Sequence, residues 1–262
     1  MQTQTKTQNP LFQYASLGKI DDTLNKLQST AIPENWDYAK TPCQKQFPIL
    51  RNYLIHTFMR IKEQGKIAEY ERYSCFNTGL ITPNYQEIFI LFKETQDGSG
   101  RFFVEFCKES DSNLARFSKL PERATYFDDI SELFYDFGLE LRINIDHIVD
   151  DPNNIDRFPE DIKKLPKHQI INTLTGAIEH AKKRVMRNYK TAIPQYYRGQ
   201  FVPEGQIQLL LPLCLTNPST ADLALAIYKN GSYYNGRTCL TLDMAINNAR
   251  LIARPDDEWL KP

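Results

Sequence analysis

Basic and aromatic side chains are concentrated between residues 181 and 198. Arginine forks match phosphate oxygens, lysine adds a point charge, and aromatic rings stack on nucleobases. We therefore expect Arg184, Arg187 and Lys190 to hold phosphates. The side chains expected to stack a base or orient the ligand are Asn188, Tyr189, Gln195 and Tyr197. The alternative interpretation is a solvated helix face whose positive charge favours the C-terminal turn.

A second polar stripe is expected on the last helix. Asp243, Asn247 and Arg250 follow one another at i, i+4 and i+7, so the three share one face of a helix. Asn247 and Asn248 are weak helix formers, and locally unfavourable residues sometimes mark sites. The alternative is an exposed ladder in which Asp243 merely caps the helix. If this stripe and the basic segment face one pocket, together they form a composite ligand site.

Candidates for catalysis are fewer. Asp146 and His147 follow an expected strand, where the histidine could serve as an acid or base. The chain contains no nucleophile elbow, HExxH, P-loop or GxGxxG motif. Its five cysteines lack metal-knuckle or CxxC spacing, so we predict no metal, no cofactor and reduced thiols. Reduced thiols favour a cytoplasmic location.

The charge of the 262-residue chain is balanced, with 32 Lys and Arg against 32 Asp and Glu. This balance argues against coating nucleic acid through bulk charge, but it allows a confined anion site. Six basic and no acidic side chains lie within 182–198, whereas 146–161 holds six acidic and one basic. The longest apolar run is far shorter than a membrane span, so we expect no membrane association.

Hydrophobic spacing indicates an α+β fold. Helices are expected over 50–64, 128–137, 167–189 and 242–253. Strands are expected over 73–76, 87–93, 101–107, 139–145, 206–215, 222–228 and 238–240, and a long connection over 146–167. Because strands come in adjacent runs, we predict one globular domain over 41–262, with a mixed or antiparallel sheet flanked by three to four helices. Residues 1–40 are expected to form a polar, partly disordered extension.

Several segments resemble a mainly bacterial family catalogued as domain of unknown function 3825. They are Leu50–Ile67, Phe76–Leu80, Glu87–Phe89, Asn154–Pro159, Asn188–Tyr197, Gln208–Leu215 and Leu240–Leu260. The resemblance covers roughly residues 40–262 and implies one domain. Similar domains occur beside cold-shock, OB-type or RNA-processing modules, which implies RNA or nucleotides by association only. The family provides no established catalytic residues.

Three functions remain open. The first is an RNA- or nucleotide-binding domain, in RNA metabolism or in stress or phage defence. The second is an enzyme acting on a nucleotide or RNA phosphoester, which would combine the basic segment with Asp243, Asn247, Arg250 and His147. The third is a protein-interaction domain with a protein partner, since aromatic residues are abundant.

Overall fold

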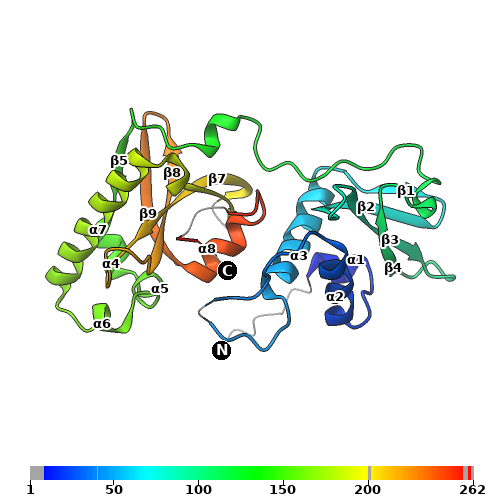
Figure 1. Ribbon diagram of the computed structural model, residues 1–262, viewed down its shortest axis with the longest axis horizontal. Helices are drawn as coiled ribbons and strands as arrows, with labels where there is room; N and C mark the ends of the chain where they lie inside the picture. The colour runs from blue at the N-terminus through cyan, green and yellow to red at the C-terminus, as the bar shows by residue number, and fades with distance from the viewer. Residues whose placement is uncertain (1–8, 40, 200–201, 256–258, 261–262) are drawn as a thin grey trace. The chain divides into compact units, whose positions relative to one another are not determined.

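The computed structural model describes residues 9–39, 41–199, 202–255 and 259–260. It divides into two units, which are described separately below. Unit 1 comprises Met1–Asp37 and Cys43–Thr125, and unit 2 comprises Tyr38–Pro42 and Tyr126–Pro262. The predicted α+β class is confirmed, but each unit has a sheet of its own where the sequence predicted a single sheet (Figure 1).

Unit 1 is an antiparallel sheet covered by helices, with strand order β1-β2-β3-β4. Its strands are β1 (Ala68–Tyr70), β2 (Tyr73–Ile81), β3 (Glu87–Glu94) and β4 (Arg101–Lys108). Its helices are α1 (Pro10–Tyr14), α2 (Ile20–Thr30) and α3 (Pro48–Glu63), followed by the 3-10 turn η1 (Ser112–Leu114). The expected helix over 50–64 and the hairpin of 87–93 with 101–107 are therefore present within one or two residues.

The expected N-terminal extension contributes to unit 1. Residues 1–8 and 40 lie outside the described residues. In α1 and α2, Leu11, Leu24 and Leu27 are fully buried, as is Trp36 after them. These four side chains therefore belong to the core, whereas Phe12 of α1 is exposed, and the segment up to Asp37 is part of unit 1.

Unit 2 contains a mixed sheet with strand order β5-β9-β8-β7-β6, in which β5 runs parallel to β9 and the other pairs are antiparallel. The strands are β5 (Glu140–Ile143), β6 (Ile193–Gly199), β7 (Val202–Leu213), β8 (Leu223–Asn230) and β9 (Tyr233–Thr241). The helices are α4 (Ile145–Asp150), α5 (Pro152–Ile155), α6 (Glu160–Lys163), α7 (Lys167–Arg187) and α8 (Leu242–Ala249), with 3-10 turns η2 (Ile130–Leu133) and η3 (Tyr189–Thr191).

Two expectations for unit 2 differ from the structure. The helix expected over 128–137 is only the one-turn η2, because Asp129 caps the turn and the chain is extended again at Phe134. The connection expected over 146–167 contains three short helices, α4 to α6. Asn144 and Asp151 each accept a backbone hydrogen bond at the start of α4 and α5, which stabilises such short turns.

Helices α7 and α8 cover opposite faces of the unit 2 sheet (Figure 1). Leu174 and Val185 of α7 share a buried cluster with Leu209, Leu211 and Leu213 of β7. Since side chains alternate along a strand, Gln208 and Leu210 point to the other face. That face is covered by α8, whose buried residues are Ala245, Ile246 and Ala249.

Candidate anion site

The turn between α7 and β6 places an aromatic and a basic side chain next to the α8 side of the sheet. Helix α7 ends at Arg187, and the side chain of Asn188 accepts a hydrogen bond from the backbone N–H of Lys190 at 3.1 Å. Asn188 also caps the start of η3, so Tyr189 and Lys190 belong to η3 and do not continue α7. Their side chains then reach a pocket that α7 itself does not line.

The pocket has a volume of about 290 Å³ and lies within unit 2. Its described lining comes from the end of η2, from η3 and the start of β6, and from α8 and the segment that follows it. These residues are Leu133, Phe134, Tyr189, Lys190, Ala192, Ile193, Pro194, Ala249, Ala253, Arg254 and Pro255. Most of these side chains are apolar, so the pocket favours a flat, apolar ligand surface.

Two aromatic rings and two cations give the pocket its chemical character. The rings of Phe134 and Tyr189 have centroids 6.1 Å apart and planes inclined by 45°. Tyr189, Lys190 and Arg254 are exposed, and neither cation forms an ion pair with a described residue. An aromatic wall beside two solvated cations suits a ligand that joins a planar ring to an anionic group.

The predicted phosphate ligands Arg184 and Arg187 do not line this pocket. Arg184 Nη1 lies 3.3 Å from the Sγ atom of Cys214, and Arg187 Nη1 donates to the carbonyl oxygen of Lys183 at 3.1 Å. Burial raises the pKa of the Cys214 thiol, while the Arg184 guanidinium opposes that shift. Arg184 is therefore a neighbour of a thiol, and both arginines lie on the helix that covers the opposite face of the sheet.

The three residues of the predicted stripe on α8 also lie outside the pocket lining. Asp243 lies in the first turn of α8, where the helix dipole favours a carboxylate. Asn247 Nδ2 donates to the Tyr38 hydroxyl at 2.7 Å, and its Oδ1 atom is buried without a described partner. Arg250 caps the helix through its backbone N–H. None of the three lines the pocket, so the composite site of both stripes is not assembled.

Gln195 belongs to a buried amide network under α8. Its Nε2 atom donates to Gln208 Oε1 at 2.8 Å, and its Oε1 atom accepts from Asn248 Nδ2 at 3.1 Å. Gln195 is fully buried and Gln208 is 9% exposed. An unsatisfied buried amide is costly, and Asn248 provides a donor for the Gln195 oxygen. This contact accounts for the presence of Asn248, a weak helix former, within α8. Tyr197 lies further along β6 with its ring over Gly199, outside the pocket lining.

The candidate acid–base residues, Asp146 and His147, lie on α4 and do not line the pocket. His147 lies on α4, which contacts α7 and β9, and its Nε2 atom is 3.9 Å from Asp151 Oδ2. Its backbone N–H is held by the Asn144 side chain at 3.0 Å. His147 therefore lies within a short helix that Asn144 caps, and the pocket lining described here contains no His, Cys, Asp or Glu.

The comparison with family models gives one match. The model named domain of unknown function (DUF3825) matches residues 27–259, which include most of both units. The chain belongs to this family. Neither the comparison with curated proteins nor that with solved structures found a match. Within the described residues, every helix is too short or too polar to cross a membrane.

One family segment, Asn154–Pro159, is explained by structure rather than by a ligand. Asn154 is 2% exposed, and its Oδ1 atom accepts the backbone N–H of Cys239 at 3.1 Å. Arg157 Nη1 donates to the carbonyl oxygen of Cys239 at 2.6 Å. The two side chains therefore fasten the α5 region to β9.

Sequence reasoning missed two of the four aromatic and basic residues that line the pocket. Phe134 was expected inside a helix, with no reason to place it beside Tyr189. Arg254 precedes Pro255 just after the last helix, and that position was used only as a helix stop. A basic residue at a helix end beside proline is a weak signal, because only the fold shows that η2 and the end of α8 meet at η3.

Proposed function

We propose that unit 2 binds RNA or a nucleotide in the pocket beside η3. The observation that carries this proposal is the combination of Tyr189 and Phe134 with the cations Lys190 and Arg254 around one apolar hollow. The base would lie against the aromatic wall, and the phosphate would pair with the cations at the rim.

The size and exposure of the pocket support a single nucleotide unit. At about 290 Å³, the volume lies near the lower end of the range of ligand pockets, which is roughly 300–1,000 Å³. A base in a duplex is paired and stacked, so it cannot enter such a pocket without being extruded. The proposed ligand is therefore a mononucleotide or an unpaired nucleotide of single-stranded RNA.

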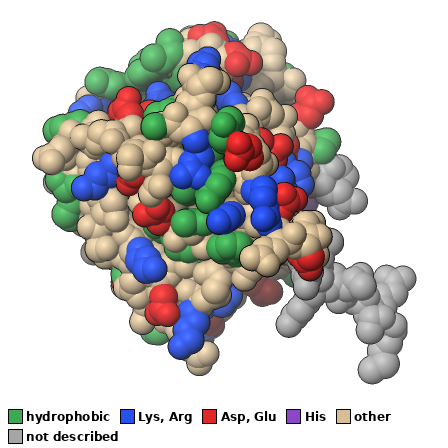
Figure 2. Space-filling view, turned by 90° about the vertical axis from the view of Figure 1, so that its right-hand side faces the viewer, with side chains coloured by type: hydrophobic (Ala, Val, Ile, Leu, Met, Phe, Trp, Pro, Cys, Tyr) green, Lys and Arg blue, Asp and Glu red, His purple; other side chains and the backbone are tan. Residues whose placement is uncertain are grey.

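The charge distribution supports a local site rather than general attraction. The net charge of the chain is zero, so the two pocket cations would be a specific rather than a general contribution to anion binding. Figure 2 draws the right-hand side of Figure 1, where unit 1 is drawn, and basic, acidic and hydrophobic side chains are interspersed there as well.

Binding is favoured over catalysis by the same lining. Proton transfer needs a positioned acid or base, and the described lining offers only Lys190, Arg254 and Tyr189 as polar side chains. An enzyme acting on a phosphoester therefore remains the weaker proposal. Incubation with RNA and nucleotide panels distinguishes the two, because any turnover that depends on Lys190 would overturn a function limited to binding.

The test is binding of fluorescent single-stranded RNA, duplex RNA and mononucleotides to the full chain at several salt concentrations. We expect single-stranded RNA or a mononucleotide to bind at low salt, and the Lys190→Ala variant to lower the salt slope by about 0.7 if one phosphate contact is lost. Lys183→Ala is the matched control, because Lys183 is exposed on α7 outside the pocket.

Undetectable binding of all three ligands at low salt would overturn the proposal and leave a protein partner as the remaining interpretation. Equal loss in Lys183→Ala and Lys190→Ala would show that binding follows net charge rather than the pocket. Tight binding of duplex RNA alone would also contradict the pocket, because a paired base cannot reach Tyr189.

A further inference from the structure

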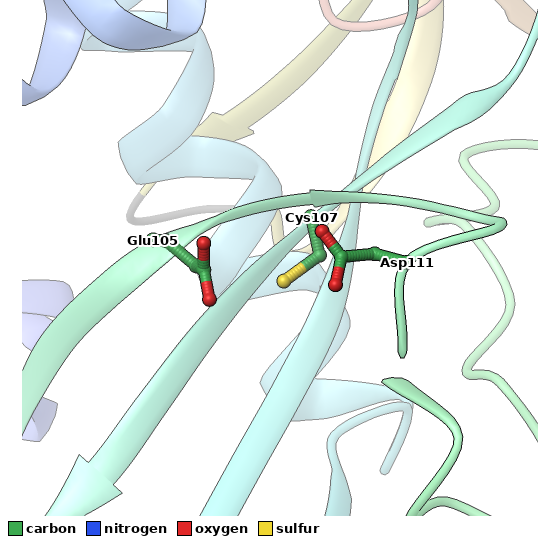
Figure 3. Close-up of side chains that lie close together, drawn as sticks. All are labelled: Glu105, Cys107 and Asp111. Atoms are coloured by element: carbon green, nitrogen blue, oxygen red, sulfur yellow. The ribbon is translucent and has the colours of Figure 1, made fainter. Parts of the chain in front are cut away.

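A second cluster of chemically active side chains lies in unit 1, at the end of β4. It consists of the Glu105 carboxylate, the Cys107 thiol and the Asp111 carboxylate, whose ligand atoms all lie within 4.8 Å of one another. Figure 3 shows the three side chains pointing toward one another. Glu105 and Cys107 are two residues apart on one strand and so share a face, and the turn after β4 brings Asp111 back to them.

The thiol is the component that a purely structural role leaves unexplained. Cys107 is fully buried, and its Sγ atom has no hydrogen-bond partner among the described residues. A free cysteine in an apolar core is ordinarily a small hydrophobic residue. Cys75, fully buried in the same cluster of side chains, fits that description, because it is not part of the group of ligand atoms. Cys107 differs because its Sγ atom faces two carboxylates.

The carboxylates are held in place by one neighbouring residue. Asn113 Nδ2 donates to Glu105 Oε1 at 2.6 Å, and the Asn113 backbone N–H donates to Asp111 Oδ1 at 2.9 Å. One oxygen of each carboxylate, Oε2 and Oδ2, remains without a hydrogen bond to a described residue. Arg116 Nη2 lies 3.4 Å from Asn113 Oδ1, and Arg116 itself stacks over the Tyr73 ring at 3.9 Å.

No ion pair neutralises the two carboxylates among the described residues. Among the described residues, the side-chain oxygens of Glu105 and Asp111 accept hydrogen bonds from Asn113 alone. Two carboxylates held close together repel each other, and the nearby Arg116 guanidinium contacts Asn113 rather than either of them. A cation placed among the free oxygens and the Sγ atom would remove this repulsion.

We propose that Glu105, Cys107 and Asp111 form a binding site for a divalent transition metal ion of the zinc class. Zinc accepts thiolate sulfur at about 2.3 Å and carboxylate oxygen at about 2.0–2.2 Å, so neighbouring ligands in a tetrahedral site lie about 3.5 Å apart. The side chains need to tighten only modestly to reach this spacing. Binding forms the metal–sulfur bond, and the Cys107 thiol proton leaves to solvent, with no oxidation or reduction.

The chemistry of the donors also selects the ion. A thiolate is a soft ligand that disfavours Mg²⁺ and Ca²⁺, whereas a mixed sulfur and oxygen set suits Zn²⁺ and the similar Co²⁺. Three protein ligands leave the fourth tetrahedral position for water. The hydrogen bonds from Asn113 then act as the outer contacts that orient the ligating carboxylates.

The site was not foreseen from the sequence for a clear reason. Metal-binding cysteines were sought as pairs or beside histidines, and no such spacing occurs. The spacing Glu-x-Cys-x-x-x-Asp is not a recognised motif. Only the strand alternation at 105 and 107, followed by a tight turn, places these three residue types together.

The experiment uses the full chain, stripped with a chelator and titrated with Co²⁺, with Zn²⁺ used afterwards to displace it. Cobalt bound by a thiolate shows a sulfur-to-metal charge-transfer absorption in the near ultraviolet, which oxygen ligands alone do not produce. The exposed Cys43 is replaced by Ser in every sample, so that a surface thiol does not contribute. We expect one equivalent of Co²⁺, the charge-transfer band, and its loss on adding Zn²⁺.

Variants identify the ligands. Cys107→Ser should abolish the band, whereas Cys75→Ser, the matched control in the same core, should retain it. Glu105→Gln, at a half-buried position that tolerates a polar amide, should weaken Co²⁺ affinity at least 10-fold and serves if Cys107→Ser fails to fold. The proposal is overturned if no thiolate band forms with excess Co²⁺, if the band survives in folded Cys107→Ser, or if Glu105→Gln binds Co²⁺ as tightly as the wild type.

Discussion

The pocket beside η3 in unit 2 and the Glu105–Cys107–Asp111 cluster in unit 1 have opposite charge and different origins. The pocket combines two cations with aromatic rings, whereas the cluster combines two carboxylates with a thiol. The pocket is assembled from three stretches of the chain, 133–134, 189–194 and 249–255, which only the tertiary fold brings together. The cluster comes from one strand and the turn that follows it. The cluster shows that a candidate site formed by neighbouring residues is overlooked when its residue spacing matches no known motif. The pocket shows that a basic helix such as α7 can end beside a candidate site without lining it.

Reversing both cations of the pocket is expected to have the largest effect. Hydrogen bonds to charged groups contribute about 1.5–3 kcal/mol each, so Lys190→Glu with Arg254→Glu should weaken RNA or nucleotide binding about 100-fold or more. Fluorescence anisotropy at fixed low salt measures this loss. Cobalt binding at the cluster should be unchanged, because the two sites recognise opposite charges.

The matched control reverses two charges on α7, Lys183→Glu with Arg187→Glu. Both residues are exposed, and neither lines the pocket. A loss of binding as large as that of the pocket variant would show that the basic face of α7, as the sequence first indicated, is itself the binding surface.

Removing the aromatic wall is expected to have the next largest effect. Stacking of a base on an aromatic side chain contributes about 1–3 kcal/mol, so Tyr189→Ala should weaken binding by roughly 5- to 150-fold with little change in the salt slope. Titration of the same ligand at several salt concentrations separates this effect from lost charge. Tyr197→Ala should bind the ligand as tightly as the wild type does. If Tyr197→Ala weakens binding more than Tyr189→Ala does, the ligand site lies further along β6.

The prediction from sequence succeeded where local pattern decides the structure. Apolar residues at helical spacing located α3 and α7, because each of these helices buries one face. A run of β-forming residues located β3, which is buried on both faces, and a second run located β4. The sequence predicted one sheet where the structure has two, since both units present the same pattern of adjacent strands and helices. Of the predicted site residues, Tyr189 and Lys190 line the pocket, because the Asn188 cap ends α7 just before them.

The remaining predicted residues show what a pattern cannot convey. Helical spacing correctly placed Arg184 and Asn247 each on a polar stripe, but it gives no information on which face of the sheet each helix covers. Gln195 resembled a surface ligand-binding residue because glutamine is usually exposed, whereas it satisfies a buried amide network. Such pairings depend on strand register, which was not predicted.

Removing the residue that orients both carboxylates tests the unit 1 site alone. Loss of an outer contact of a metal site typically weakens metal affinity about 10- to 100-fold, and we expect Asn113→Ala to do so for Co²⁺. Competition with a chromophoric chelator measures the change. Nucleotide binding should be unaffected, and unchanged Co²⁺ affinity would remove Asn113 from the site.

The smallest expected effect on either site comes from Asn154–Pro159, one of the segments on which the family resemblance rests. Asn154→Ala leaves the buried backbone N–H of Cys239 without its acceptor, so the free energy of unfolding should fall by about 1–3 kcal/mol. Urea unfolding measures this loss, and Asn153→Ala is the control, because Asn153 is exposed next to it. Ligand affinity below the unfolding transition should match the wild type at both sites. If Asn154→Ala instead remains stable and loses RNA or nucleotide binding, this segment is part of a ligand site. Its contacts with β9 would then serve ligand binding and not only packing.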